Sequence, residues 1–221
     1  AALEAIYTIA TRPGRSVETV CDEAAGHLAR LLDVPYVVIR RVEAGLLKML
    51  SKYDHGALVH RGTQSVDCGP CARVHAERKT LQFRDALAEA FPGTPCVEAE
   101  GVQSYLGAPL LGSQGEPLGV VCVMSKTERA YTPEEVHLLE IFAQYVAYEI
   151  EHSRLSKELQ DAEQAKLLGQ IASGVAHEVR NPLNAIGIST QLLERSLAEN
   201  EAGREYVERI RRQTDRLTKL M

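Results

Sequence analysis

The stretch Gly174-Val-Ala-His-Glu-Val-Arg-Asn-Pro-Leu183 lies inside the strongest helical pattern of the chain. Apolar residues recur through it at steps of four and three, which predicts one seam of a coiled coil. Because each helical residue turns by about 100°, His177 lies about 200° from Val175 and should face solvent. Asn181 follows one helical turn later on the same face. The predicted seam comprises Val175, Val179, Leu183, Ile186, Thr190, Leu193 and Leu197.

The residues around His177 suit phosphoryl transfer to an imidazole. A neutral ring nitrogen that is open to solvent can lie in line with a phosphate. Glu178 can take or hold the proton of the other ring nitrogen, and Asn181 can orient a water for the reverse hydrolysis. Pro182 lacks an N–H and its ring crowds the carbonyl of Glu178, so the helix should bend or loosen here. The alternative for His177 is a solvated surface histidine without chemistry.

This stretch resembles the phosphoacceptor box of sensor histidine kinases, and the likeness covers about residues 166–221. The resemblance implies an all-α dimerisation and histidine-phosphotransfer hairpin. It assigns His177 as phosphoacceptor, Glu178 as acid/base partner and Asn181 as the phosphatase residue. It further implies a cognate response regulator and an ATP-binding catalytic domain that uses ATP and magnesium. That domain should lie beyond Met221, because the chain contains no Gly-rich nucleotide segments of that kind.

The composition excludes several classes of protein. A chain of 221 residues with 45% hydrophobic and 25% charged residues is typical of one or two globular domains. The net charge of −5 gives no general attraction to nucleic acid. No apolar run approaches the roughly 18 residues of a membrane span, and the N-terminus lacks a signal-peptide pattern. Five scattered cysteines indicate a reduced, cytoplasmic protein rather than a disulfide framework.

Residues 1–151 are expected to form an α+β domain. Ser16 is a helix cap, β-branched runs predict strands, and Gly112-Ser-Gln-Gly115 separates two largely apolar strands of a hairpin. Segment 57–101 is irregular and carries short elements. This order predicts an antiparallel sheet with flanking helices. The predicted helices are 3–11, 16–32, 69–78 and 86–91, and the predicted strands are 35–42, 46–53, 65–67, 81–84, 103–111 and 117–124.

The hairpin carries a second resemblance. Ser104-Tyr-Leu-Gly-Ala-Pro-Leu-Leu111 and Gly115-Glu-Pro-Leu-Gly-Val-Val121 resemble the closing strands of GAF sensory domains, and the likeness spans about residues 16–151. We expect a small-molecule ligand between the sheet and segment 57–101, because long insertions over a rigid sheet tend to form sites. The alternative is a domain that serves only for dimerisation.

A long helix should connect the two domains. Thr132, Pro133 and Glu135 form a capping box with proline at the first helical position, and no strong breaker follows before Gly169. We therefore expect one helix over residues 133–198. Its heptads shift phase between residues 162 and 168, and residues 152–168 are assigned to a coiled-coil signalling helix. The shift favours a joint that passes rotation or splay to the histidine, and the alternative is a passive spacer.

Residues 169–221 form the predicted hairpin, with its turn at 198–203. Two hairpins, each with an apolar seam, can bury both seams as a four-helix bundle, so we expect a parallel homodimer. The residue opposite His177 would fall at about position 224, so the second helix should be truncated. Its basic residues are read as a solvated face, or as a surface for an acidic partner. The second seam comprises Val207, Ile210, Thr214, Leu217 and Met221.

The cysteines of the first domain allow two functional readings. As a thiol pair, Cys68 and Cys71 have thioredoxin-type spacing, although the βαβ context is missing. As ligands, they can join Cys96 and a fourth group, such as His75 or solvent, around a metal or an iron–sulfur cluster. The structural alternative gives the three cysteines no such role, and no metal is assigned.

The sequence around the other cysteines and histidines does not single them out as ligands of a metal or a haem. Cys21 and Cys122 lie on apolar faces and are expected in the core. His55, His60 and His75 are haem candidates in principle, but we prefer solvated or pocket-lining roles for them.

These features predict a cytoplasmic fragment of a sensor histidine kinase of a two-component system. It would be phosphorylated from ATP on a histidine and would pass the phosphoryl group to an aspartate of a response regulator. One alternative is a non-catalytic, GAF-containing dimeric scaffold whose hairpin docks a partner. The other is a cysteine-based metal or redox sensor.

Overall fold

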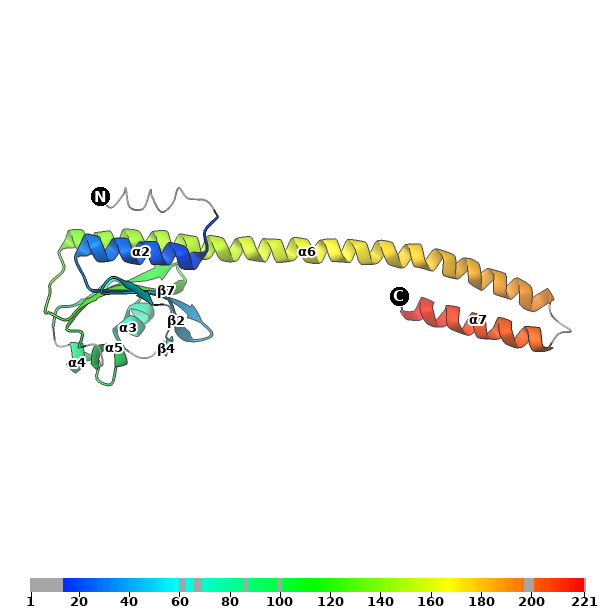
Figure 1. The fold of residues 1–221 in the computed structure, drawn as a ribbon, viewed down its shortest axis with the longest axis horizontal. Coiled ribbons are helices and arrows are strands. Elements are labelled where there is room, and N and C mark those ends of the chain that lie inside the picture. The colour runs from blue at the N-terminus through cyan, green and yellow to red at the C-terminus, as the bar shows by residue number, and fades with distance from the viewer. Residues whose placement is uncertain are drawn as a thin grey trace. The chain divides into compact units, whose positions relative to one another are not determined.

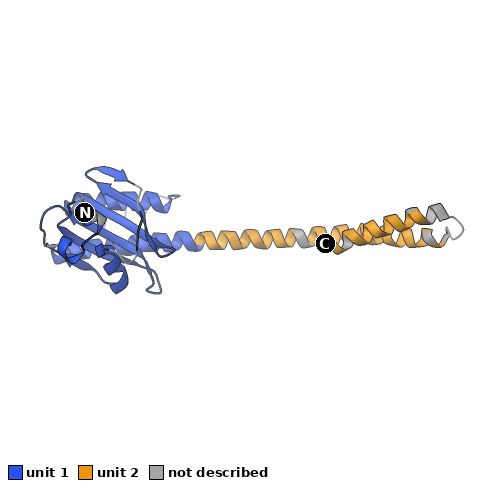
Figure 2. Ribbon diagram, turned by 90° about the horizontal axis from the view of Figure 1, so that it is seen from below, with its two compact units in different colours: residues 1–155 blue, residues 156–221 orange. Residues whose placement is uncertain are grey.

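The computed structural model describes residues 14–59, 63–65, 69–85, 87–98, 101–196 and 201–220, with a few side chains in these ranges excepted. The chain divides into two compact units, residues 1–155 and 156–221 (Figure 2). We refer to them as the first unit and the second unit. The helix predicted at residues 3–11 lies outside the described residues.

The first unit is built on an antiparallel sheet. The described strands follow the order β3-β2-β1-β7-β6-β5, and β4 also pairs with β2. The hairpin predicted from Gly112 to Gly115 joins β6 to β7, and the amide of Gly112 donates to the carbonyl of Glu116 at 2.9 Å. The strands are β1 (Tyr36–Glu43), β2 (Leu46–Asp54), β3 (Ala57–Val59), β4 (Thr63–Ser65), β5 (Leu81–Phe83), β6 (Ser104–Leu111) and β7 (Pro117–Ser125).

Helices cover both faces of this sheet (Figure 1). On one face lie α2 (Val17–Leu32) and the first part of α6 (Pro133–Ser196), and on the other lie α3 (Gly69–Glu77), α4 (Leu87–Ala90) and α5 (Pro95–Glu98). Alternate residues of β1 therefore enter two different cores: Val37 and Ile39 pack with α2 and α6, and Tyr36 and Val38 pack under α3. The predicted fold class is confirmed.

The predicted caps of the two long helices are confirmed. The hydroxyl of Ser16 accepts from the amide of Thr19 at 3.2 Å, at the start of α2. At the start of α6, Glu135 accepts from the amide of Thr132 at 2.8 Å, and Thr132 accepts in return from the amide of Glu135 at 3.3 Å. Each bond satisfies an amide that the first helical turn leaves free.

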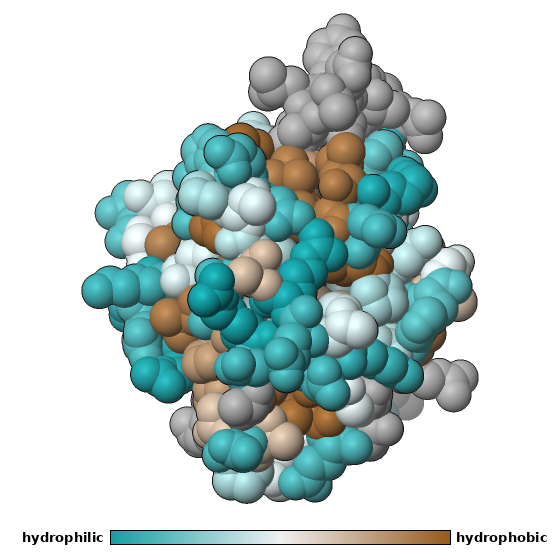
Figure 3. Space-filling model, turned by 90° about the vertical axis from the view of Figure 1, so that its left-hand side faces the viewer, coloured by the Kyte–Doolittle hydropathy of each residue, from teal (hydrophilic) through white to brown (hydrophobic). Residues whose placement is uncertain are grey.

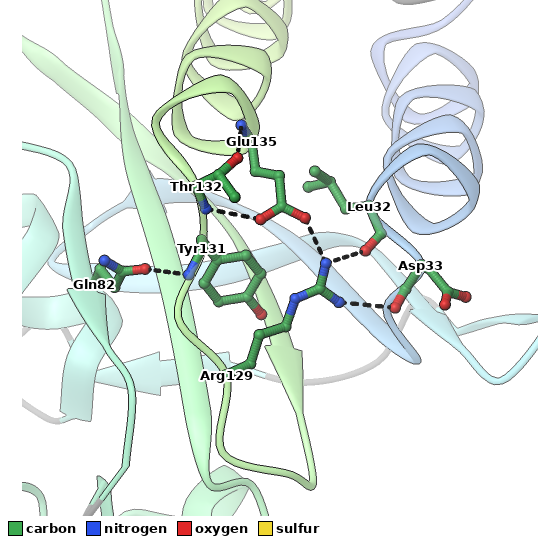
Figure 4. A network of polar contacts seen from close by, with 7 residues as sticks. All are labelled: Leu32, Asp33, Gln82, Arg129, Tyr131, Thr132 and Glu135. Atoms are coloured by element: carbon green, nitrogen blue, oxygen red, sulfur yellow. Dashed lines mark hydrogen bonds and ion pairs between the residues drawn. The ribbon is translucent and has the colours of Figure 1, made fainter.

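A polar network ties the start of α6 to the rest of the first unit (Figure 4). Arg129 donates to the carbonyls of Leu32 and Asp33, at the end of α2, and pairs with Glu135 at 2.5 Å. The amide of Tyr131 donates to the side chain of Gln82 in β5 at 2.6 Å. The end of α2 and strand β5 thus both hold the helix where it begins.

Two more contacts hold α6 farther along the first unit. Thr80, which follows α3, donates from its hydroxyl to Glu140 at 2.7 Å. Ser113, in the turn between β6 and β7, donates from its hydroxyl to Glu151 at 2.6 Å and from its amide at 3.0 Å. The end of the first unit presents a largely hydrophilic surface, with hydrophobic residues in smaller groups (Figure 3).

The second unit is a helical hairpin. The last part of α6 runs to Ser196, and α7 (Glu201–Leu220) lies alongside it (Figures 1 and 2). Helix α6 continues past Pro182 without interruption, and the bend expected there stays a prediction. Helix α7 begins at Glu201, inside the range predicted for the turn, because the residues up to Gly203 already have helical backbone geometry.

The short elements of segment 57–101 match the prediction less closely. The predicted loop at 92–95 is found at residues 92–94, and Pro95 begins α5, which was not predicted. In this short helix the carbonyl of Thr94 accepts from the amides of Val97 and Glu98 at 3.0 Å each. Strand β3 was not predicted, and β4 ends at Ser65, where the predicted strand at 65–67 began. The order and type of α3, β5 and α4 agree with the prediction.

Candidate functional site

The sequence-predicted phosphoacceptor site lies on the part of α6 that belongs to the second unit. His177, Glu178, Asn181 and Pro182 are all exposed. His177 and Asn181 are separated by one helical turn and so share a face. Among the described contacts, none joins the imidazole of His177 to Glu178 or Asn181. The imidazole is therefore exposed to solvent, and the acid/base role of Glu178 stays a prediction.

The apolar seam next to this site is only half covered. In α6, Leu183 and Thr190 are buried, and in α7, Val207 and Thr214 are buried, with exposed fractions of 3% to 8%. The other seam positions whose side chains are described remain open. These are Val175, Val179, Ile186, Leu193, Ile210 and Leu217, with exposed fractions of 39% to 53%. One set of heptad positions thus packs inside the hairpin, and the other set forms an open apolar stripe.

The predicted cysteine trio is not brought together by the described residues. Cys68 lies outside them, and Cys96 lies in α5 with its side chain not described. Cys71 is buried in α3, and its thiol neighbour is Cys122 of β7, with the two sulfur atoms 3.6 Å apart. Cys21 and Cys122 are fully buried, as predicted for core residues.

Sequence reasoning did not select the contact between Cys71 and Cys122. The two residues are separated by 51 positions, and Cys122 is part of an apolar strand that reads as plain core. Only the pairing of β7 with β1 and β6, and the packing of α3 on this sheet, place the two thiols together.

Tyr105 of β6 completes a buried group around Cys71. Its hydroxyl donates to the sulfur of Cys71 at 3.4 Å, and both side chains are buried. Gly107 makes room for this hydroxyl, because a Cβ atom at that position would overlap the Tyr105 ring. Burial raises the pKa of Tyr105 well above its usual value, so the hydroxyl keeps the proton that it donates.

The hydrogen bond with Cys122 lowers the pKa of Cys71, and this effect outweighs the opposing effect of burial. The positive charge of Arg40 and the hydrogen bond from Tyr105 act in the same direction. By contrast, burial raises the pKa of Cys21 to about 12. The two described cores therefore hold thiols of opposite character.

The histidines of the first unit occupy ordinary environments where they are described. His55 is exposed, lies 2.8 Å from a carboxylate oxygen of Asp54 and meets the ring of Tyr36 edge-on. His75 is half-buried, and burial lowers its pKa. His60 lies outside the described residues. Within the described part of the chain, no three His, Cys, Asp or Glu side chains gather as a metal site would require.

The first unit also contains a hollow beside α6. Its volume is about 670 Å³, and Arg78, Thr80, Pro109, Glu140 and Gln144 are among the residues that line it. The predicted ligand site lies on the other face of the sheet, over segment 57–101. Parts of that segment lie outside the described residues, so that site stays a prediction.

Two known protein families match different parts of this chain. A family model for the GAF domain matches residues 16–150, and one for the His Kinase A (phospho-acceptor) domain matches residues 167–221. The chain belongs to the GAF domain family, and a His Kinase A phospho-acceptor domain follows its GAF domain. Both resemblances noted in the sequence are thereby confirmed, and they support a fragment of a sensor histidine kinase.

Curated relatives agree with this assignment over a limited length. The sensor histidine kinase ZraS of Salmonella typhi is 33% identical over 81 residues, which cover 36% of this chain and 17% of that protein. The sensor protein kinase PilS of Pseudomonas aeruginosa is 40% identical over 65 residues, which cover 28% of this chain and 12% of that protein. The chain thus spans less than a fifth of the length of either relative.

Solved structures support the fold of the first unit. The GAF domain of an Acinetobacter phosphoenolpyruvate-protein phosphotransferase matches with a TM-score of 0.60 and 16% identity, over 70% of this chain and 92% of that one. At this identity the likeness concerns the fold. None of the described helices is long and apolar enough to cross a membrane.

Proposed function

We propose that this chain is the sensory and phosphoacceptor part of a cytoplasmic sensor histidine kinase of a two-component system. His177 accepts the γ-phosphoryl group of ATP and then passes it to an aspartate of a response regulator. The exposed imidazole within the matched phospho-acceptor domain carries this proposal. The two matched families include no ATP-binding domain, so MgATP would be bound by a catalytic domain in another part of the protein or in a separate chain.

The residues beside His177 have separate roles in this reaction. One ring nitrogen attacks the γ-phosphorus while ADP leaves, and Glu178 holds the proton on the other nitrogen so that the attacking lone pair is free. Asn181, one turn away, orients the water that hydrolyses the phospho-aspartate of the partner. Replacing Glu178 by Ala should slow phosphorylation by about 10²-fold or more.

The open seam supports a homodimer as the working form. A second hairpin can cover the exposed stripe of Val179, Ile186, Leu193, Ile210 and Leu217, and a four-helix bundle results. The GAF domain would bind the signal, which we propose to be a small molecule. Contacts of the first unit with Glu140 and Glu151 support α6 as the element that carries the signal to His177.

The phosphoacceptor role is tested by labelling with radioactive ATP and an added catalytic domain of a histidine kinase. Replacement of His177 by Gln should abolish labelling and leave the fold and the dimer unchanged, since the side chain faces solvent. His152→Gln is the matched control, because His152 is another exposed histidine of α6 and should stay dispensable. The label should be labile in acid and stable in base, as expected for a phosphoramidate.

A second candidate function is a non-catalytic dimeric scaffold. The same open stripe that fits a second copy also supports this role, because it needs no reactive histidine. Acid-stable label, or equal labelling of the wild type and the His177→Gln protein, would contradict the kinase proposal and favour the scaffold.

A further experiment separates the two activities. Asn181→Ala should still be phosphorylated on His177, whereas the rate at which the dimer dephosphorylates a response regulator should fall. An equal loss of both activities would show that Asn181 supports structure instead of orienting a water.

A further inference from the structure

The buried thiols of the first unit have no part in the phosphoryl transfer proposed above. Cys71 and Cys122 lie in the core between α3 and the sheet, with exposed fractions of 2% and 0%. Their sulfur atoms are 3.6 Å apart, whereas a disulfide requires about 2.05 Å. An approach of about 1.5 Å would therefore join them, which is a side-chain and helix adjustment rather than an unfolding event.

The surroundings make the two thiols unequal. Cys71 occupies the first turn of α3, where free amides and the helix dipole favour a thiolate. The hydrogen bond with Cys122 favours the thiolate of Cys71 most, and the charge of Arg40 and the hydrogen bond from Tyr105 act in the same direction. Cys122 lies in the middle of β7, a strand paired on both sides and therefore held in place. Cys71 is the nucleophile of the pair, and Cys122 is its resolving partner.

We propose that Cys71 and Cys122 form a reversible dithiol–disulfide switch that responds to hydroperoxides. The thiolate of Cys71 attacks the peroxide, which gives a sulfenic acid on Cys71 and releases an alcohol, or water from hydrogen peroxide. The thiol of Cys122 then attacks the sulfur of Cys71, the disulfide forms and water leaves. Overall, the two thiols lose two electrons and two protons, and one hydroperoxide is reduced to alcohol and water. A dithiol reductant reverses the step.

The position of α3 connects this pair to the helix that leads to His177. Drawing Cys71 toward β7 moves α3, and the chain leaves the end of α3 at Glu77 and reaches Thr80 three residues later. The hydroxyl of Thr80 holds Glu140 of α6 at 2.7 Å. Oxidation should therefore shift or break this bond. The readout is faster amide hydrogen exchange in the first turns of α6, around residues 137–144.

The test uses the whole chain in a C68S/C96S background, so that the thiols outside the described contact cannot contribute. The reduced protein is treated with hydrogen peroxide, the remaining thiols are blocked with N-ethylmaleimide, and peptides are analysed by mass spectrometry without reduction. We expect a link between Cys71 and Cys122, two thiols lost per chain, and full recovery with dithiothreitol. Because both thiols are buried, the rate should level off at high peroxide, where local opening of α3 becomes limiting.

Matched variants separate the switch from a general effect of oxidation. Cys21→Ser removes a thiol that is equally buried but lies in the other core, and it should leave the link and its rate unchanged. Cys122→Ser keeps a hydrogen-bonding group beside Cys71 but cannot form the disulfide, so it should trap the sulfenic acid on Cys71, which dimedone labels. Tyr105→Phe should slow formation of the link by several-fold, while thermal denaturation reports whether the fold is kept.

Three results would overturn the proposal. One is the absence of the link at peroxide concentrations that leave the fold intact. Another is a link that forms only in denaturant. The third is a metal ion in the purified protein that shields both thiols until a chelator removes it. None of these experiments requires ATP or His177, so their outcome is independent of the phosphoacceptor proposal.

Discussion

Helix α6 passes through two regions in which its apolar residues are buried to different extents. In the first unit, Leu139, Phe142 and Val146 are fully buried against α2 and the sheet. In the second unit, Ile186 and Leu193 on the same helix retain 43% and 50% of their exposure. The first region completes its core within one chain, whereas the second leaves half of a seam exposed. Burial along one helix therefore separates a self-sufficient domain from the surface that we propose as the dimer interface.

The largest expected effect lies in the closed core. Leu139→Ala should lower the free energy of unfolding of the first unit by about 2–5 kcal/mol, because it leaves a cavity among fully packed side chains. The loss should be the same at all protein concentrations, as measured by urea denaturation followed by circular dichroism. Tyr148→Ala, at a position that is 61% exposed on the same helix, is the control and should change little. A concentration-dependent loss for Leu139→Ala would contradict the distinction between the regions.

The next effect concerns the open seam and depends on concentration. Leu193→Asp should weaken the proposed dimer by at least about tenfold, because the dimer would bury an unpaired charge. Light scattering at micromolar concentration should report about twice the chain mass for the wild type and a lower mass for the variant. Gln191→Asp adds the same charge at an exposed position off the seam and should leave the dimer intact. A wild-type chain that is monomeric would contradict the dimer.

A smaller effect tests how firmly the first unit holds α6. Thr132→Ala removes the cap that accepts from the amide of Glu135, and it should cost about 1 kcal/mol of stability. The change should appear in thermal denaturation of the first unit and should leave the mass of the dimer unaltered. Loss of the dimer in this variant would show that the two regions are coupled more tightly than their burial suggests.

The smallest expected effect is a pH dependence of the stability of the first unit, which comes from Glu151. The hydrogen bonds from Ser113 lower the pKa of Glu151 below its usual value. The bonds therefore stabilise the fold above the usual pKa of a glutamate, and this contribution is lost as the pH falls through the lowered value. Carboxyl resonances followed by NMR should show a lowered pKa for Glu151. Ser113→Ala removes the hydroxyl bond and keeps the amide bond, so it should return the pKa part of the way toward the ordinary value, and an unchanged titration would exclude the hydroxyl as a cause.

Local signals in the sequence predicted most of the fold. The capping box at Thr132, the cap at Ser16 and the hairpin around Gly112 each depend on neighbouring residues, so the sequence alone was enough to find them. Short helix α5 was missed because a single turn has too few residues to show a periodicity. Exposure of His177 followed from helical phase alone.

Features that depend on distant parts of the chain were not predictable in the same way. The pair of Cys71 and Cys122 is separated by 51 positions, and only the sheet order brings its members together. The seam pattern identified both sets of heptad positions. Which set packs inside the hairpin depends on the turn and on α7, and a repeat of four and three cannot specify it.

The buried threonines of the hairpin affect how easily α6 and α7 can move against each other. The hydroxyl of Thr190 donates to the carbonyl of Gly187, and that of Thr214 donates to the carbonyl of Ile210, so each is satisfied by its own helix. Neither of these two bonds joins α6 to α7. Sliding or rotating one helix against the other would therefore leave both of these intrahelical bonds in place. Small movements of the two helices would then meet little resistance from these hydroxyls, which suits the proposed role of the hairpin in presenting His177 to a catalytic domain and to a response regulator.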